Sequence, residues 1–101
     1  MNITIQEEEK VLKVEFGGRL DSLSVPDAEK NVLTLLTEKQ FEKIVLDMKE
    51  VDYIASSGLR LIFTIFKNGR GQGARVVLKN VNDFVRSVLN DTGLAAMFEF
   101  E

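Results

Sequence analysis

The chain has no cysteine and no histidine among its 101 residues. Without cysteine there is no disulfide framework, no thiolate metal site and no cysteine nucleophile. Without histidine there is no Ser-His triad and no imidazole ligand or proton shuttle. Carboxylate, lysine, tyrosine or serine chemistry would each need an arranged partner group, which no motif supplies. The sequence therefore predicts a protein that is not an enzyme and that holds no metal or cofactor.

Charge of either sign is balanced, and no long hydrophobic run is present. The chain has thirteen Lys and Arg and sixteen Asp and Glu. Its net charge is therefore -3, and the two signs are interspersed along the sequence. Nucleic acid is held by clustered basic charge, so it is not the expected partner. The longest nearly apolar stretch, residues 61–66, is too short to insert into a membrane, and the first five residues lack the features of a signal peptide. We expect a cytoplasmic protein.

Hydrophobic periodicity predicts a single α/β domain over residues 1–101. Alternating apolar residues predict a hairpin near the start, and apolar runs at residues 44–46 and 74–78 predict buried strands, with Asp47 ending the first. Helices are expected after Ser24 as N-cap, after Ser56 and after the segment 80–83, and Thr92-Gly93 ends the third. The expected fold is a mixed sheet of four to five strands with helices packed against it, closed by a packed tail with a short strand. The apolar face expected for the second helix is Leu59, Ile62, Phe63 and Phe66.

Two loops at the carboxyl ends of strands are the predicted site, Gly18–Ser24 and Val51–Gly58. In the second, Ser56 or Ser57 is explained in the simplest way as an N-cap. A phosphoryl group on Ser56 would also suit this position, because free backbone N–H groups and the helix dipole favour an anion there. Gly58 would let a phosphate or a kinase approach the backbone.

Residues across the chain resemble the STAS domain of bacterial anti-sigma factor antagonists. The resemblance covers roughly residues 3–98 and is carried by Gly18-Arg-Leu-Asp21, Ile44-Val-Leu-Asp47, Val51-Asp-Tyr-Ile54, Ala55-Ser-Ser-Gly-Leu59, Val76-Val-Leu78 and the segment from Val85 to Thr92-Gly-Leu94. It implies a protein that binds an anti-sigma factor when unphosphorylated and so frees a sigma factor for transcription. The anti-sigma factor of such systems is usually also a serine kinase, and it phosphorylates the first Ser of an Asp-Ser-Ser/Thr-Gly-Leu motif, which falls on Ser56.

The resemblance also implies which residues meet the partner of this monomer or weak dimer. Asp21 matches the acidic residue in the loop beside the phosphorylation site, and Ser57 is the neighbouring hydroxyl. With the exposed face of the second helix, the predicted contact set is Asp21, Ser56, Ser57, Gly58 and Arg60.

Alternatives remain open at Ser56. Ala55 stands where phosphorylated members typically carry Asp, so a constitutive STAS module, acting as a scaffold or as an accessory subunit of a transport complex, is the second interpretation. A small hydrolase with Ser56 as nucleophile belongs to a different class, and the missing histidine argues against it. Asp47 and Asp52 could bind a metal in some α/β folds, but strand ending and turn formation explain them better.

Overall fold

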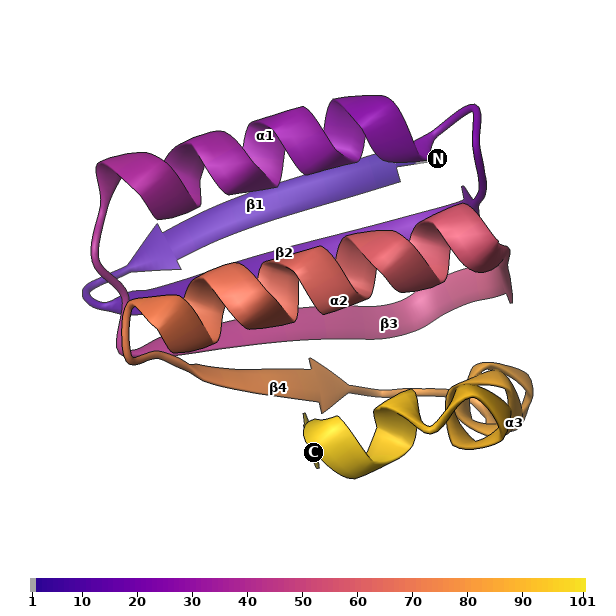
Figure 1. The fold of residues 1–101 in the computed structure, drawn as a ribbon. Coiled ribbons are helices and arrows are strands. Elements are labelled where there is room, and N and C mark those ends of the chain that lie inside the picture. Colours follow the sequence, from indigo (N-terminus) through magenta and orange to yellow (C-terminus); the bar gives the residue numbers. More distant parts are fainter. Residues whose placement is uncertain (1) are drawn as a thin grey trace.

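Five strands form one mixed sheet in the computed structural model, which describes residues 2–101 (Figure 1). The spatial order is β1-β2-β3-β4-β5, with β1 antiparallel to β2 and every other neighbouring pair parallel. The α/β class and the mixed sheet expected from the sequence are confirmed. The elements in chain order are β1 (Asn2–Glu8), β2 (Val11–Leu20), α1 (Val25–Glu38), β3 (Lys43–Ile54), α2 (Ser56–Gly71), β4 (Arg75–Lys79), α3 (Asp83–Thr92), the 3-10 helix η1 (Leu94–Met97) and β5 (Glu99–Phe100).

Helices α1 and α2 lie side by side over the same face of the sheet (Figure 1). Alternate residues of β2 and β3 point into the layer between sheet and helices and are buried, as the two-residue period of a strand requires. The core thus lies beneath the two helices, and the carboxyl ends of β2 and β3 reach the same edge of the sheet.

Two glycines bring α2 unusually close to the sheet. A Cβ on Gly69 would lie 2.7 Å from Val76 Cγ2, and Gly58 is equally crowded at the other end of the helix. The buried face of α2 therefore runs through Gly58, Leu61, Ile62, Ile65 and Gly69. The expected face is confirmed in part. Ile62 is buried, and Leu59 and Phe66 are half-buried against the core, but the most buried positions are the compact residues and glycines, because helix and sheet approach most closely there.

Strand β3 is longer than the sequence suggested. It does not end at Asp47, where pairing with β4 stops, but continues to Ile54 beside β2. The expected loop Val51–Gly58 is therefore wrong, since a single residue, Ala55, separates β3 from α2. Asp47 instead accepts hydrogen bonds from the Lys49 N–H at 3.0 Å and from Asn80 Nδ2 at 3.2 Å.

Beyond Asp47, β3 no longer pairs with β4. Helix α3 packs against this second half of β3. Asn82 joins the two elements with both ends of its amide. Its Oδ1 accepts from the Val85 N–H at 2.8 Å and caps α3, while its Nδ2 donates to the Val51 carbonyl of β3 at 2.8 Å. The predicted cap in segment 80–83 is confirmed, as is the left-handed Gly93 (φ 80°) that ends α3.

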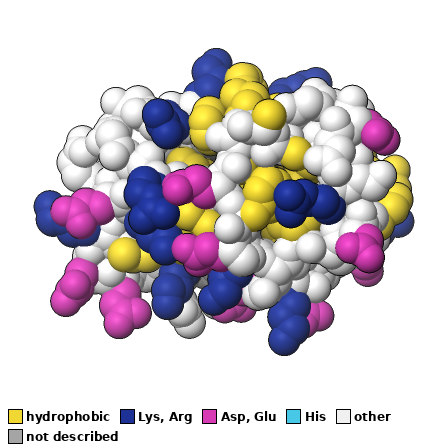
Figure 2. All heavy atoms as spheres, turned by 90° about the horizontal axis from the view of Figure 1, so that it is seen from below, with side chains coloured by type: hydrophobic (Ala, Val, Ile, Leu, Met, Phe, Trp, Pro, Cys, Tyr) yellow, Lys and Arg dark blue, Asp and Glu magenta, His cyan; other side chains and the backbone are white. Residues whose placement is uncertain are grey.

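The C-terminal segment closes the sheet as a packed tail with a short strand, as expected. Phe98 is 7% exposed and meets Phe66 edge to face, with ring centroids 4.9 Å apart. Arg75 and Glu99 form a two-pronged ion pair, and the Arg86 guanidinium lies 3.8 Å from the Phe100 ring centroid. Seen from below, basic and acidic side chains are interspersed around hydrophobic surface that basic groups partly cover (Figure 2). Within residues 2–101, no helix is both long enough and apolar enough to span a membrane.

Replacing Asn82 with Ala should destabilise the protein by about 1–2 kcal/mol, because α3 loses its cap and the Val51 carbonyl loses its donor. Asn82→Ser should lose less, since a serine hydroxyl can still cap the helix. Urea denaturation followed by circular dichroism measures both changes. Equal losses for the two variants would show that the cap contributes nothing.

Candidate functional site

The candidate site lies where β2 and β3 end and α2 begins. The Ala55 N–H donates to the Leu20 carbonyl at 2.9 Å, so the last residue of β2 is bonded to the residue that precedes α2. Asp21 and Ser56 are the next residues on the two segments. The structure therefore brings the loop 21–24 and the first turn of α2 together. Both expected loops are shorter than predicted, because residues 18–20 belong to β2 and only Ala55 separates β3 from α2.

The first turn of α2 has no side-chain cap. Ala55 occupies the N-cap position in extended conformation (φ -98°, ψ 178°), and the turn contains no acidic residue. The expectation that Ser56 or Ser57 is the N-cap is wrong. Ser56 is the first helical residue and is exposed, Ser57 is half-buried, and Arg60 is exposed one turn further along. The N–H groups of this turn can therefore receive an anion.

Gly58 is buried, and its missing Cβ serves packing. A Cβ at this position would lie 2.7 Å from the Leu20 carbonyl oxygen, 2.8 Å from Ile54 Cγ1 and 2.9 Å from Leu20 Cβ. The sequence analysis explained this glycine by the approach of a phosphate or a kinase. The structure explains it instead by the close packing of α2 against β2. Any larger residue would push the start of α2 away from Leu20 and with it Ser56.

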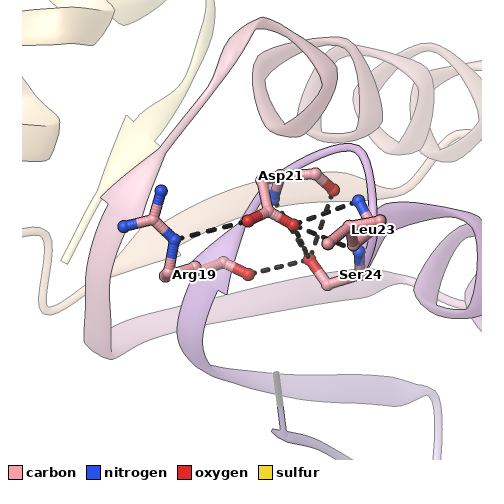
Figure 3. A network of polar contacts seen from close by, with 4 residues as sticks. All are labelled: Arg19, Asp21, Leu23 and Ser24. Carbon is pink, nitrogen blue, oxygen red and sulfur yellow. Dashed lines mark hydrogen bonds and ion pairs between the residues drawn. The ribbon is translucent and has the colours of Figure 1, made fainter.

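The loop 21–24 is held by the Asp21 carboxylate (Figure 3). Its Oδ1 accepts from the backbone N–H groups of Leu23 at 3.1 Å and Ser24 at 3.2 Å, and its Oδ2 accepts from Arg19 Nε at 3.3 Å. The Ser24 hydroxyl donates to the Arg19 carbonyl at 2.8 Å. Ser24 occupies the N-cap position of α1, but its side chain does not cap that helix, because the hydroxyl is used inside the loop.

Asp21 therefore organises the loop. Its side chain is 23% exposed. Partial desolvation raises the pKa of the Asp21 carboxyl, but the hydrogen bonds from Leu23, Ser24 and Arg19 together outweigh it and lower the pKa below its ordinary value. The carboxylate is ionised at neutral pH and occupied by partners from its own loop.

Four residues that the sequence reasoning did not assign to the site lie beside it: Arg19, Tyr53, Phe84 and Leu23. The Arg19 guanidinium lies 4.1 Å from the Tyr53 ring centroid, and Tyr53 stacks on Phe84 with centroids 6.4 Å apart. Arg19 and Tyr53 are cross-strand partners in β2 and β3. Only the strand register brings them together, so a single sequence gives no signal for the pair. Leu23, at the tip of the loop, is 89% exposed.

Within residues 2–101 no group of three or more acidic side chains is gathered as metal ligands would be. Asp52 is exposed. Asp47 lies within β3, and its carboxylate accepts hydrogen bonds from Lys49 and Asn80. The arrangement can bind and release a protein surface or an anion.

Gly58→Ala should destabilise the protein by about 1–3 kcal/mol, because a backbone carbonyl cannot move aside cheaply. Gly71→Ala is the matched control in the same helix, since nothing lies within 4 Å of the added Cβ. That variant should be neutral or stabilising by about 0.5–1 kcal/mol. Thermal and urea unfolding compare the two, and a neutral Gly58→Ala would contradict the tight contact.

Acidification should release the loop through Asp21. A carboxyl whose pKa is lowered by folding stabilises the network above its ordinary pKa, and the network is lost as the pH falls through the lowered value. In a 15N–1H NMR titration, the amide signals of Leu23 and Ser24 should shift with a midpoint below 3.8, the ordinary value for Asp. Asp21→Asn is the control in which this titration disappears. A midpoint above 3.8 would show that desolvation outweighs the hydrogen bonds.

Comparison with known proteins shows which proteins share this fold. The anti-sigma-B factor antagonist of Staphylococcus aureus is 29% identical over 94 residues, covering 93% of this chain and 86% of the relative. SpoIIAA of Bacillus in its phosphorylated form has a TM-score of 0.81 at 17% identity, covering 99% of this chain and 91% of that one. The unphosphorylated form of SpoIIAA has the same TM-score at 15% identity, with coverages of 99% and 87%.

A transport-related protein shares the fold as well. The sulfate transporter family protein of Wolinella succinogenes has a TM-score of 0.78 at 24% identity, covering 92% of this chain and 78% of that one. The family described as STAS domain matches residues 2–101. The chain belongs to the STAS domain family.

Proposed function

We propose that this chain is an anti-sigma factor antagonist, a regulator without enzymatic activity that binds an anti-sigma factor and so frees a sigma factor for transcription. The relatives that carry this name support the proposal, since they match nearly the whole chain. The observation that carries it is Ser56, which stands exposed at the first position of α2 beside the ordered loop 21–24. A partner that covers this edge of the sheet meets Ser56, Ser57 and Arg60 directly.

Phosphorylation of Ser56 is the proposed switch. The modification adds close to two negative charges where uncapped N–H groups and the positive end of the α2 dipole favour an anion. Arg60 lies one turn away on the same helix and can neutralise part of the charge. The modified protein thus keeps its fold, and the partner is lost because its surface now meets a solvated dianion.

The kinase is then the partner itself, an anti-sigma factor with serine kinase activity, as in the family that the sequence resembles. Gly58 does not contact the partner. It contributes by packing against Leu20, which fixes the position of Ser56 relative to the loop 21–24. Asp21 acts through the loop that it holds, since its carboxylate is already bonded to Leu23, Ser24 and Arg19.

The competing function is a constitutive STAS module that is never phosphorylated. Ala55 favours it, because a kinase that recognises a carboxylate before the target serine finds none here. The structural similarity to a sulfate transporter family protein suits one form of this alternative, an accessory subunit of a transport complex. Both functions use the same surface, and only the response to phosphate at Ser56 separates them.

Affinity capture from lysate of the native cell distinguishes them with four baits: wild type, Ser56→Ala, Ser56→Glu and Thr37→Glu. Thr37 is exposed near the far end of α1, so Thr37→Glu adds the same charge away from the site. We expect an anti-sigma factor on every bait except Ser56→Glu, with binding to that variant weakened about tenfold or more, and phosphate on Ser56 of the wild type by mass spectrometry. Equal capture by all four baits, with Ser56 unmodified, would instead establish the constitutive module.

A further inference from the structure

Leu23 is an exception among the large apolar residues. It is 89% exposed, whereas Phe84 is 51% exposed, Met97 is 41% exposed, and the remaining large apolar side chains of residues 3–101 are buried or half-buried. A leucine in water contributes nothing to the core of its own domain. Its apolar surface leaves water only when another molecule covers it. A single exposed leucine is unremarkable by itself, so its surroundings decide.

The backbone beneath Leu23 is fixed. Its N–H donates to Asp21 Oδ1, and the next residue, Ser24, is held by its own N–H and by its hydroxyl (Figure 3). The loop therefore presents the side chain from an ordered turn. Little backbone entropy remains to be lost when a partner binds there, which is a property of a preorganised anchor residue.

A hollow of about 580 Å³ opens beside Leu23, between the start of β1, the end of β2 and the first turns of α1. Its lining includes Arg19, Asp21 and Asp27. Arg19 is paired with Asp21 at 3.3 Å, whereas the exposed Asp27 carboxylate forms no ion pair within residues 2–101. Asp27 is stabilised by the positive end of the α1 dipole, and the hollow is lined by one more carboxylate than basic groups, which fits a basic side chain.

Leu23 and Ser56 lie on two segments that meet at Leu20. The segments that carry them are joined by the bond from the Ala55 N–H to the Leu20 carbonyl and by the contact of Gly58 with Leu20. A protein that covers Ser56 can therefore also contact the tip of the loop 21–24.

We infer that Leu23 is an anchor residue for the protein that Ser56 switches, inserting into an apolar pocket of that partner while the adjacent hollow receives a Lys or Arg side chain through Asp27. This inference rests on the proposed function. Asp21 is then a positioning residue, which holds the turn that presents Leu23.

Calorimetric titration tests the anchor with the purified protein that the wild type captures. Leu23→Ala should weaken its binding roughly thirtyfold. Met97→Ala is the matched control, because it truncates another exposed apolar side chain, beside the start of β5, and it should change the affinity less than twofold. Asp27→Asn should weaken binding several-fold at low salt and less at high salt. Circular dichroism should show an unchanged Tm for Leu23→Ala, since the side chain is 89% exposed and does not belong to the core.

A photo-crosslinking amino acid at position 23 of the full chain, in the native cell, supplies an independent readout. Crosslinking to the protein whose capture is lost with Ser56→Glu supports the anchor. No crosslinked protein, a crosslink to a second copy of this chain, or an affinity of Leu23→Ala within twofold of wild type overturns it. If the crosslinked protein is not an anti-sigma factor, the proposed function fails and the anchor stands. If Ser56→Glu abolishes binding while Leu23→Ala does not weaken it, the anchor fails and the function stands.

Discussion

The contact between Gly58 and the backbone of Leu20 is the constraint on which the site depends. It lets the start of α2 lie against the end of β2, and only at that separation can the Ala55 N–H reach the Leu20 carbonyl. Gly69 repeats the close approach about three turns later. The helix is thus laid along the sheet at both ends. Because the core beneath it is rigid and densely packed, the position of Ser56 relative to the loop is set by the fold.

The loop is arranged with its charge turned inward and its apolar residue turned outward. The Asp21 carboxylate satisfies N–H groups of its own turn, as an isolated loop must do to stay ordered without a covering element. Leu23 is what remains on the outside. Charge that is already hydrogen-bonded contributes little new attraction to a partner, whereas exposed apolar area contributes when it is covered. Asp21, which the sequence analysis selected, therefore shapes the turn. Leu23, which it did not select, provides the apolar contact surface.

The sequence predicted the order of strands and helices because the buried runs and the helix ends leave local signals. Asn82 and Gly93 are examples, since a cap and a left-handed residue act within a few positions of the chain. The extension of β3 to Ile54 was missed because residues 47–53 mix charged and apolar side chains like a loop, and their partner is β2, distant in sequence. The reason for Gly58 and the pairing of Arg19 with Tyr53 are likewise tertiary, so one sequence could point to the loops but not to how they meet.

Ala55 affects the proposed switch in two opposing ways. An Asp at this N-cap position would accept from the N–H groups of Ser57 or Gly58 and would itself neutralise part of the positive helix end. With Ala55 those N–H groups have no side-chain partner, so a phosphate on Ser56 would be the first anionic group to reach them. The substitution therefore removes a recognition element for a kinase but improves the site for the product of phosphorylation. An exposed serine over an uncapped turn that can hold its phosphate is the physical argument for placing the phosphorylated antagonist ahead of the constitutive module.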